Sequence, residues 1–154
     1  MSGFCDFKFR GRNFSTDKYY HLYNRGFLKM KIFKSDGDCF RFIDTMQFYC
    51  KIFGVKIFNY SLMANHFHFL VKGGDISKFM QKLQQSYATY FNIKYKRVGA
   101  VFGGRFSSVV VDKDGYFRDL KKYIALNPVM MIKISPDGTE INSSVQVRTS
   151  TFYE

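Results

Sequence analysis

The chain has 154 residues, of which 46% are hydrophobic and 19% aromatic, so it is not an intrinsically disordered protein. This length suits one domain with a core of its own. Lysine and arginine total 24 against 12 acidic residues, and the net charge of +12 indicates a polyanionic partner, most commonly nucleic acid.

The first third of the chain predicts an arm, a strand and a helix. Residues 1–17 alternate between polar and aromatic side chains and are predicted to form an N-terminal arm. Residues 19–26 predict a first strand that ends in a turn. In residues 36–53 the apolar side chains recur at spacings of three and four, which predicts an amphipathic helix ending at Gly54.

The middle of the chain predicts one or two strands and a second helix. Residues 55–71 are apolar and aromatic without Gly or Pro, which is typical of a strand, or of two strands joined by a tight turn near residues 64–65. The glycines that follow interrupt this segment, and Asp75 is the predicted N-cap of a helix over residues 76–94.

A glycine-rich loop over residues 99–105 precedes a predicted strand over 106–111. The aspartates after this strand open a third predicted helix, which ends at Asn127 because Pro128 cannot continue it. The order of elements favours an α+β fold, a ferredoxin-like or RRM-like antiparallel sheet with helices on one face plus an additional C-terminal helix.

The predicted domain organisation is an arm over residues 1–17, one domain over 18–145 and a C-terminal tail over 146–154. The three cysteines are far apart and form no C-x-x-C pair, which argues against a disulfide framework and a zinc ribbon. The charged N-terminal residues are unlike a signal peptide, and no apolar run reaches the length of a membrane span. We therefore expect a cytoplasmic protein with no membrane partner.

His66 and His68 are the most informative residues of the sequence. Because side chains alternate along a strand, both histidines point to one face, while Phe67, Phe69 and Val71 point to the core. Two imidazoles at this spacing can bind one divalent metal ion. The alternative is a pair of half-buried histidines on a sheet face, which is the better interpretation for His-x-His taken alone.

The third predicted helix places Tyr123 and Asn127 on one helix face, because they are four residues apart. A tyrosine in a helix is usually a core residue, and an asparagine before proline is a common helix end. The same pair could instead supply a nucleophilic phenol and an amide oxygen as a third metal ligand.

Basic residues around the glycine-rich loop are candidates for binding nucleic acid. The predicted contacts are Arg25, Lys94, Lys96, Arg97 and Arg105. Backbone amides at the glycines can approach phosphates closely, and Arg105 adds charge. A flexible hairpin with solvated charges is an equally good interpretation of any one of these residues.

Four segments together resemble a known family. They are Tyr20–Gly26, Met63–Val71, Gly99–Phe106 and Lys122–Val129, in matching order and spacing. They are similar to the HUH single-tyrosine transposases, particularly the REP-associated tyrosine transposases and the insertion-sequence-200-like relatives. The resemblance covers roughly residues 19–145, most of the chain.

The resemblance implies the same α+β fold that the order of elements predicts. It also implies a DNA transposase that cleaves and rejoins single-stranded DNA, often beside a hairpin. It implies that His66, His68 and Asn127 bind Mg²⁺ or Mn²⁺. It also implies that Tyr123 attacks the scissile phosphate and forms a 5′-phosphotyrosine. Relatives include monomers and homodimers, so the oligomeric state stays open.

The chain departs from the family pattern at two positions near these motifs. Phe102 stands where the family often has tryptophan, and Ala64 stands where it commonly has proline. Among other functions, a non-catalytic nucleic-acid-binding module with an RRM-like sheet is the main alternative. A cupin-like or hydrolytic metalloenzyme is disfavoured, because Lys72 and Gly73 stand where an acidic ligand is expected.

Overall fold

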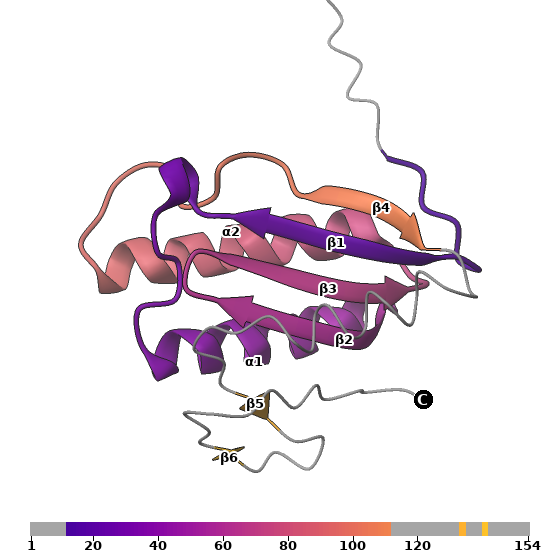
Figure 1. Cartoon of the computed structure of the whole chain (residues 1–154), viewed down its shortest axis with the longest axis horizontal. Helices are drawn as coiled ribbons and strands as arrows, with labels where there is room; N and C mark the ends of the chain where they lie inside the picture. Colours follow the sequence, from indigo (N-terminus) through magenta and orange to yellow (C-terminus); the bar gives the residue numbers. More distant parts are fainter. Residues whose placement is uncertain (1–11, 112–132, 135–139, 142–154) are drawn as a thin grey trace, which may run out of the picture.

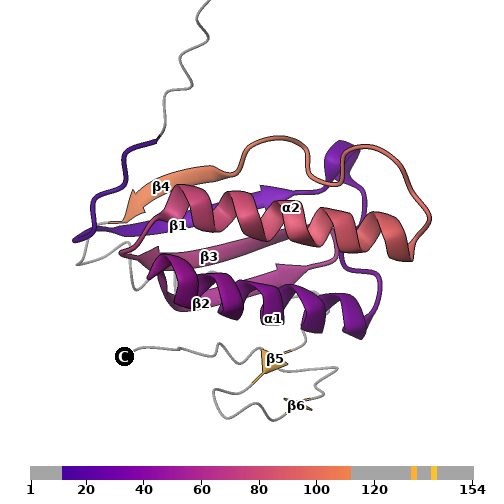
Figure 2. The same cartoon turned by 180° about the vertical axis from the view of Figure 1, so that it is seen from behind.

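The computed structural model describes residues 12–111, 133–134 and 140–141. In this part of the chain a four-stranded antiparallel sheet packs against two helices, which cover the same face of the sheet (Figures 1 and 2). In chain order the elements are β1 (Tyr19–Arg25), the 3₁₀ turn η1 (Phe27–Lys29), α1 (Asp36–Phe53), β2 (Lys56–Met63), β3 (His66–Lys72), α2 (Ile76–Lys94), β4 (Ser107–Val111), β5 (Lys133–Ile134) and β6 (Glu140–Ile141).

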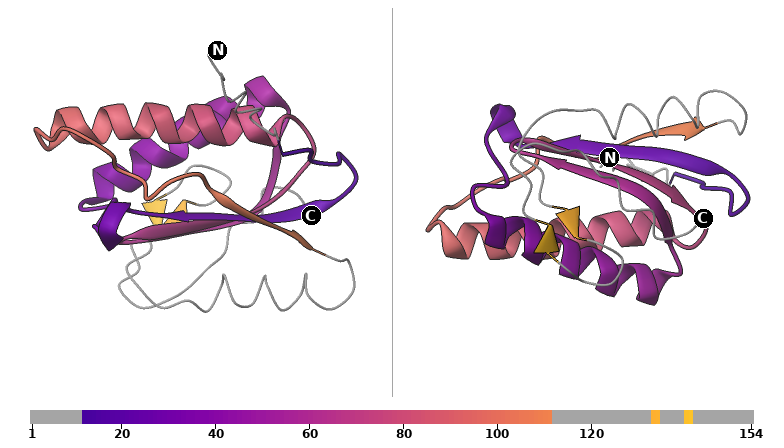
Figure 3. Two further views of the ribbon diagram at one scale, coloured as in Figure 1. Left: turned by 90° about the horizontal axis from the view of Figure 1, so that it is seen from above. Right: turned by 60° about the horizontal axis from the view of Figure 1, so that its bottom comes forward.

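The strand order β2-β3-β1-β4 places β1 and β3 at the centre of the sheet. Seen from above in Figure 3, both helices lie on one side of the strands. The predicted α+β, ferredoxin-like arrangement is thus confirmed, including the tight turn at residues 64–65 between β2 and β3. The additional helix predicted to carry Tyr123 lies outside the described residues.

The core lies between the helices and the sheet. Alternation along the central strands turns Tyr20 and Leu22 of β1, and Phe67 and Phe69 of β3, toward the helices, and all four are buried. The largest fully buried side chains are Tyr87, Phe42, Phe67, Phe69, Phe79 and Phe91. The rings of Phe42, Phe67 and Tyr87 pack against one another with centroid distances of 5.0 Å for Phe42–Phe67 and for Phe42–Tyr87.

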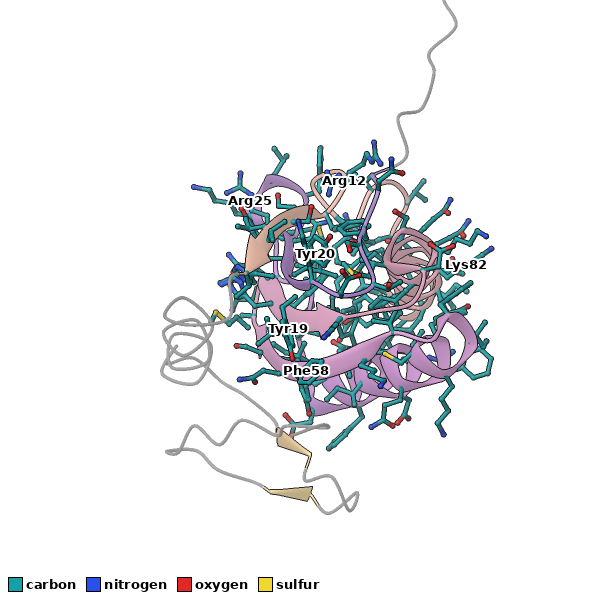
Figure 4. All side chains as sticks on the ribbon, turned by 90° about the vertical axis from the view of Figure 1, so that its right-hand side faces the viewer. Arg12, Tyr19, Tyr20, Arg25, Phe58 and Lys82 are labelled. Atoms are coloured by element: carbon teal, nitrogen blue, oxygen red, sulfur yellow. The ribbon has the colours of Figure 1, made fainter. Side chains whose placement is uncertain are left out.

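A smaller apolar group lies on the opposite face of the sheet. It consists of Leu70 and Val111, both buried, with Tyr19 and Phe58 packed against them. Figure 4 shows Tyr19 and Phe58 next to each other, and their ring centroids are 5.1 Å apart. The face away from the helices therefore combines this apolar group with the buried polar residues His21 and His68.

Local sequence signals define the ends of both helices. Ser35 and Asp38 form a capping box at the start of α1, and Gly54 ends it with a φ of 68°, a left-handed conformation that glycine adopts without steric cost. The side chain of Asp75 accepts a hydrogen bond from the backbone N–H of Lys78 at the start of α2, as the sequence predicts.

Asp38 also joins the two helices. Its side chain is fully buried and accepts hydrogen bonds from Lys94 Nζ (2.7 Å), the Tyr95 hydroxyl (2.6 Å) and the Tyr90 hydroxyl (3.0 Å). The backbone N–H groups at residues 34 and 35 donate to the same carboxylate, at 2.9 and 3.1 Å. One carboxylate therefore connects the N-terminus of α1 with the C-terminal turns of α2.

β5 and β6 pair with each other as an antiparallel two-stranded sheet. No helix in the described ranges has both the length and the apolar character needed to cross a bilayer. The domain boundaries at residues 17 and 145 stay predictions.

Candidate functional site

His66 and His68 occupy the first half of β3, on the face of the sheet opposite the helices. Phe67 and Phe69 point from the same strand into the core and are fully buried. The alternation predicted for this segment is therefore confirmed. The ring centroids of the two histidines are 5.1 Å apart, so the imidazoles are direct neighbours.

The pairing of β1 with β3 determines which other residues lie beside these histidines. Tyr23 is the cross-strand partner of His68, and Arg25 is the partner of His66. His21 lies diagonally across from His68 on the same face, since its own partner is Leu70. The end of β1 thus brings a phenol, a guanidinium and a third imidazole to the same face.

Each histidine uses its Nδ1 in a hydrogen bond. Nδ1 of His66 is 2.6 Å from Oδ1 of Asn65, and because an amide oxygen only accepts, this nitrogen carries the proton. Nδ1 of His68 is 2.9 Å from Nε2 of His21, a pair in which either ring can be the donor. In His66, Nε2 is then the nitrogen that a metal ion would use, and the same holds for His68 when its Nδ1 is the donor.

Burial keeps the three imidazoles neutral. It lowers the pKa of His21 to about 4 from the ordinary 6.5. Burial, followed by repulsion from His21 and His66, lowers the pKa of His68 to about 3. Burial also lowers the pKa of His66. Neutral imidazole is the form that binds metal ions, so no deprotonation is needed near pH 7.

The glycine-rich loop lies against the end of β1 and forms a second wall beside the histidines. The backbone N–H of Gly103 donates to the carbonyl of Arg25 (2.9 Å), and Nδ2 of Asn24 donates to the carbonyl of Gly104 (3.0 Å). Gly104 has a φ of 150°, at the edge of the region that favours glycine. Phe102, at the position where the family often has tryptophan, pairs with Gly26 and is buried against Phe67.

A cavity of about 590 Å³ opens between β1, β3 and this loop. The residues that line it are Tyr23, Asn24, Arg25, Lys29, Asn65, His66, His68, Gly103, Gly104, Arg105 and Ser107. Three of these described lining residues are cationic and none is acidic. The cavity therefore favours an anionic group such as a phosphate.

The predicted site residues fall into three groups. His66, His68, Arg25 and Arg105 line this cavity together. Figure 4 shows Arg25 on the far side of the sheet from Lys82 of α2. The second group, Lys94, Lys96 and Arg97, is absent from the cavity lining. Tyr123 and Asn127 lie outside the described residues.

The second group makes contacts of its own. Lys94 forms an ion pair with Asp38, and Arg97 donates to Oδ1 of Asn92 at 2.9 Å. Lys96 is exposed and has a φ of 50° in the turn after α2. Their predicted contacts with nucleic acid stay predictions.

The cavity also contains residues that we did not predict from the sequence, notably Tyr23, Lys29 and Asn65. Tyr23 shares the strand face of His21, so strand alternation from His21 could have suggested it. Lys29 enters the cavity from η1, where Leu28 and Lys29 have φ values of 50° and 61°. Nothing in the sequence pattern indicates that turn.

The donor set limits what the site can hold. Among the described residues no group of three His, Cys, Asp or Glu side chains is placed to bind a metal ion. The two histidines present neutral nitrogen donors whose second nitrogens are already oriented by hydrogen bonds, an arrangement typical of metal-binding histidines. The two histidines fit a metal ion whose remaining ligands are oxygen atoms.

Comparison with known proteins supports the resemblance seen in the motifs. A family model described as "Transposase IS200 like" matches residues 14–127. No curated protein matches the sequence.

Two solved structures are similar to this one. The first is a REP-associated tyrosine transposase bound to a REP hairpin, with a TM-score of 0.61 at 12% identity over 79% of this chain and 72% of that chain. The second is a protein of Deinococcus radiodurans R1 assigned as a transposase, with a TM-score of 0.52 at 17% identity over 79% of this chain and 98% of that chain. At these identities the likeness shows a shared fold. The family match, which spans most of the chain, shows that the protein belongs to the IS200-like transposases.

Proposed function

We propose that the protein cleaves and rejoins single-stranded DNA as an HUH transposase with one catalytic tyrosine, Tyr123. The observation that carries the proposal is the pair His66 and His68, side by side in a cationic cavity on the open face of a ferredoxin-like sheet. Membership of the IS200-like transposases supports the same chemistry.

The ion in this proposal is Mg²⁺ or Mn²⁺, held by Nε2 of His66, Nε2 of His68 and the amide oxygen of Asn127. Two imidazoles with oxygen donors suit a borderline-to-hard divalent ion. When bound, such an ion supplies Lewis-acid stabilisation of the charge on the scissile phosphate.

The proposed reaction is a transesterification. The phenol of Tyr123 loses its proton as its oxygen attacks the phosphorus, the P–O3′ bond breaks, and the leaving 3′ oxygen takes up one proton in exchange. The products are a 5′-phosphotyrosine and a free 3′-hydroxyl. Attack by another 3′-hydroxyl reverses the step and releases the phenol, so the number of phosphodiester bonds is conserved.

The other cavity residues position the DNA in this proposal. Arg25, Lys29 and Arg105 surround the histidines with positive charge, which opposes the repulsion between phosphates and attracts the strand. Asn24 holds the carbonyl of Gly104 and thereby keeps the loop against β1. We propose single-stranded DNA with a hairpin as the partner, because the REP-associated relative was solved bound to a REP hairpin.

The test is a denaturing gel of the protein with single-stranded oligonucleotides that tile both flanks of its gene, in Mn²⁺ or in EDTA. Each oligonucleotide is labelled at the 3′ end in one reaction and at the 5′ end in another. A 5′-phosphotyrosine moves the 3′ label with the protein and releases the 5′ label on a shorter strand. The adduct should require Mn²⁺ and should disappear in Tyr123→Phe.

Tyr23→Phe is the matched control, because Tyr23 is the described tyrosine that lines the cavity and is 37% exposed. This variant should still form the adduct. Loss of the adduct in Tyr23→Phe with retention in Tyr123→Phe would identify Tyr23 of β1 as the nucleophile. Salt-sensitive binding of the DNA without any adduct would favour the non-catalytic binding module.

A further inference from the structure

His21 is buried on the open face of the sheet and contacts the proposed metal ligand His68. Its Nε2 lies 2.9 Å from Nδ1 of His68, and the two rings stack with centroids 5.1 Å apart. Its cross-strand neighbours, Leu70 of β3 and Val109 of β4, are apolar. Among the described interactions, the hydrogen bond of His21 is the one with His68, and it connects His21 to the proposed metal site.

The strand register places His21 and His66 on opposite sides of His68. His66 is opposite Arg25 and His21 is opposite Leu70, two residues away from His68 in each direction along β3. An ion held between His66 and His68 thus lies away from His21. His21 meets His68 at its other ring nitrogen, which is the place of an outer partner and not of a third ligand.

The tautomer of His68 follows from this contact. If His21 donated the proton, Nδ1 of His68 would accept it, and the neutral ring would carry its own proton on Nε2. A protonated Nε2 has no lone pair for a metal ion. If His68 donates from Nδ1, its Nε2 is a donor to the metal. His66 already has this second arrangement, through the oxygen of Asn65.

We infer that His21 is a positioning residue of the metal site: its Nε2 accepts a hydrogen bond from Nδ1–H of His68 and so keeps Nε2 of His68 unprotonated and oriented for the ion. This inference rests on the proposed metal site at His66 and His68.

Three variants of the full chain separate this role from simple packing. His21→Gln keeps an acceptor, because the Gln Oε1 reaches about as far as the imidazole Nε2. His21→Asn also carries an amide but is one methylene shorter and does not reach His68. His21→Leu fills the space without any acceptor. Circular dichroism and thermal unfolding show that each variant is folded before it is used.

The first readout is Mn²⁺ binding without DNA, followed by electron paramagnetic resonance of the free ion. Loss of an outer hydrogen-bond partner typically weakens metal affinity by about 10- to 100-fold. His21→Leu and His21→Asn should show a loss of this size, and His21→Gln should stay close to wild type. Equal Mn²⁺ affinity in wild type and His21→Leu would overturn the role of His21.

The second readout is the histidine tautomer in the metal-free protein, from two-bond ¹H–¹⁵N correlations. We expect His68 to carry its proton on Nδ1 in wild type and in His21→Gln. A proton on Nε2 of His68 in wild type would overturn the inference. Failure of wild type to bind Mn²⁺ would overturn the metal site as well, which distinguishes the two failures.

Discussion

Two polar clusters in the described part of the chain, each built around buried side chains, are constructed in opposite ways. The Asp38 cluster (Asp38, Tyr90, Lys94 and Tyr95) joins the two helices around one charged carboxylate. The histidine cluster (His21, His66 and His68) lies on the other face of the sheet and consists of neutral rings.

The two clusters differ in how their polar atoms use hydrogen bonds. The carboxylate of Asp38 accepts five hydrogen bonds, which use its acceptor capacity and hold the helices together. In the histidine cluster, Nε2 of His21 contacts Nδ1 of His68, Nδ1 of His66 contacts Asn65, and the rings of His66 and His68 line the cavity. A carboxylate whose acceptor sites are used within the protein stabilises a fold, whereas neutral rings that line a cavity are suited to binding a ligand.

The largest effect is expected from His66→Ala or His68→Ala. Each variant removes a proposed ligand, and Mn²⁺-dependent cleavage should fall by about 100-fold or more, beyond the effect of losing an outer partner. His66→Ala should change stability little, because His66 is only half-buried, whereas His68→Ala should also lower stability, because it removes a buried ring that contacts His21. Single-turnover cleavage and urea unfolding measure the two quantities. Undiminished cleavage by both variants would contradict the metal site.

For Asp38→Ala we expect a large loss of stability instead of a loss of metal-dependent cleavage. Removing the carboxylate leaves Tyr90, Lys94 and Tyr95 without their shared acceptor, and leaving a buried donor unsatisfied costs about 1 to 3 kcal/mol. Urea unfolding measures the loss. The matched control is Asp44→Ala, an exposed position on the same helix, which should change stability by less than about 0.5 kcal/mol. Equal effects in both variants would show that the Asp38 cluster has no special role.

The sequence predicted the histidine face better than it predicted the partners of these clusters. Alternation along β3 depends on neighbouring residues alone, so His66 and His68 could be placed on one face. The contact between His21 and His68 depends on the pairing of β1 with β3, which no local pattern specifies. Lys94 was predicted as a contact for nucleic acid from its place before the glycine-rich loop, yet it pairs with Asp38, far away in sequence.

The pH dependence of stability should reflect Asp38. Burial raises the pKa of its carboxyl, but hydrogen bonds from Lys94, Tyr95, the backbone at Lys34 and Tyr90 lower it more, to about 2 from the ordinary 3.8. A lowered folded-state pKa contributes stability above the unfolded value, and this contribution is lost as pH falls from 3.8 through about 2. Acid unfolding of Asp38→Asn should lack this component. An identical acid profile in both proteins would contradict the assignment.

The smallest effect is expected from single cations of the cavity. Arg105→Ala should weaken binding of single-stranded DNA and reduce the slope of log affinity against log salt by about 0.7, the value for one lost phosphate contact. Lys82→Ala removes an equal charge from α2, on the helix side of the molecule, and should leave the slope unchanged. Fluorescence anisotropy across a salt series gives both slopes. The same slope change in both variants would indicate a general effect of net charge.

Mass spectrometry can identify the residue that becomes joined to DNA. The Mn²⁺-dependent adduct is treated with nuclease and trypsin, and the peptides are analysed by mass spectrometry. We expect a nucleotide 5′-phosphate on Tyr123 in the tryptic peptide 123–133. The same modification on the peptide 19–25, which contains Tyr23, would contradict the account and place the nucleophile in the sheet beside the histidines.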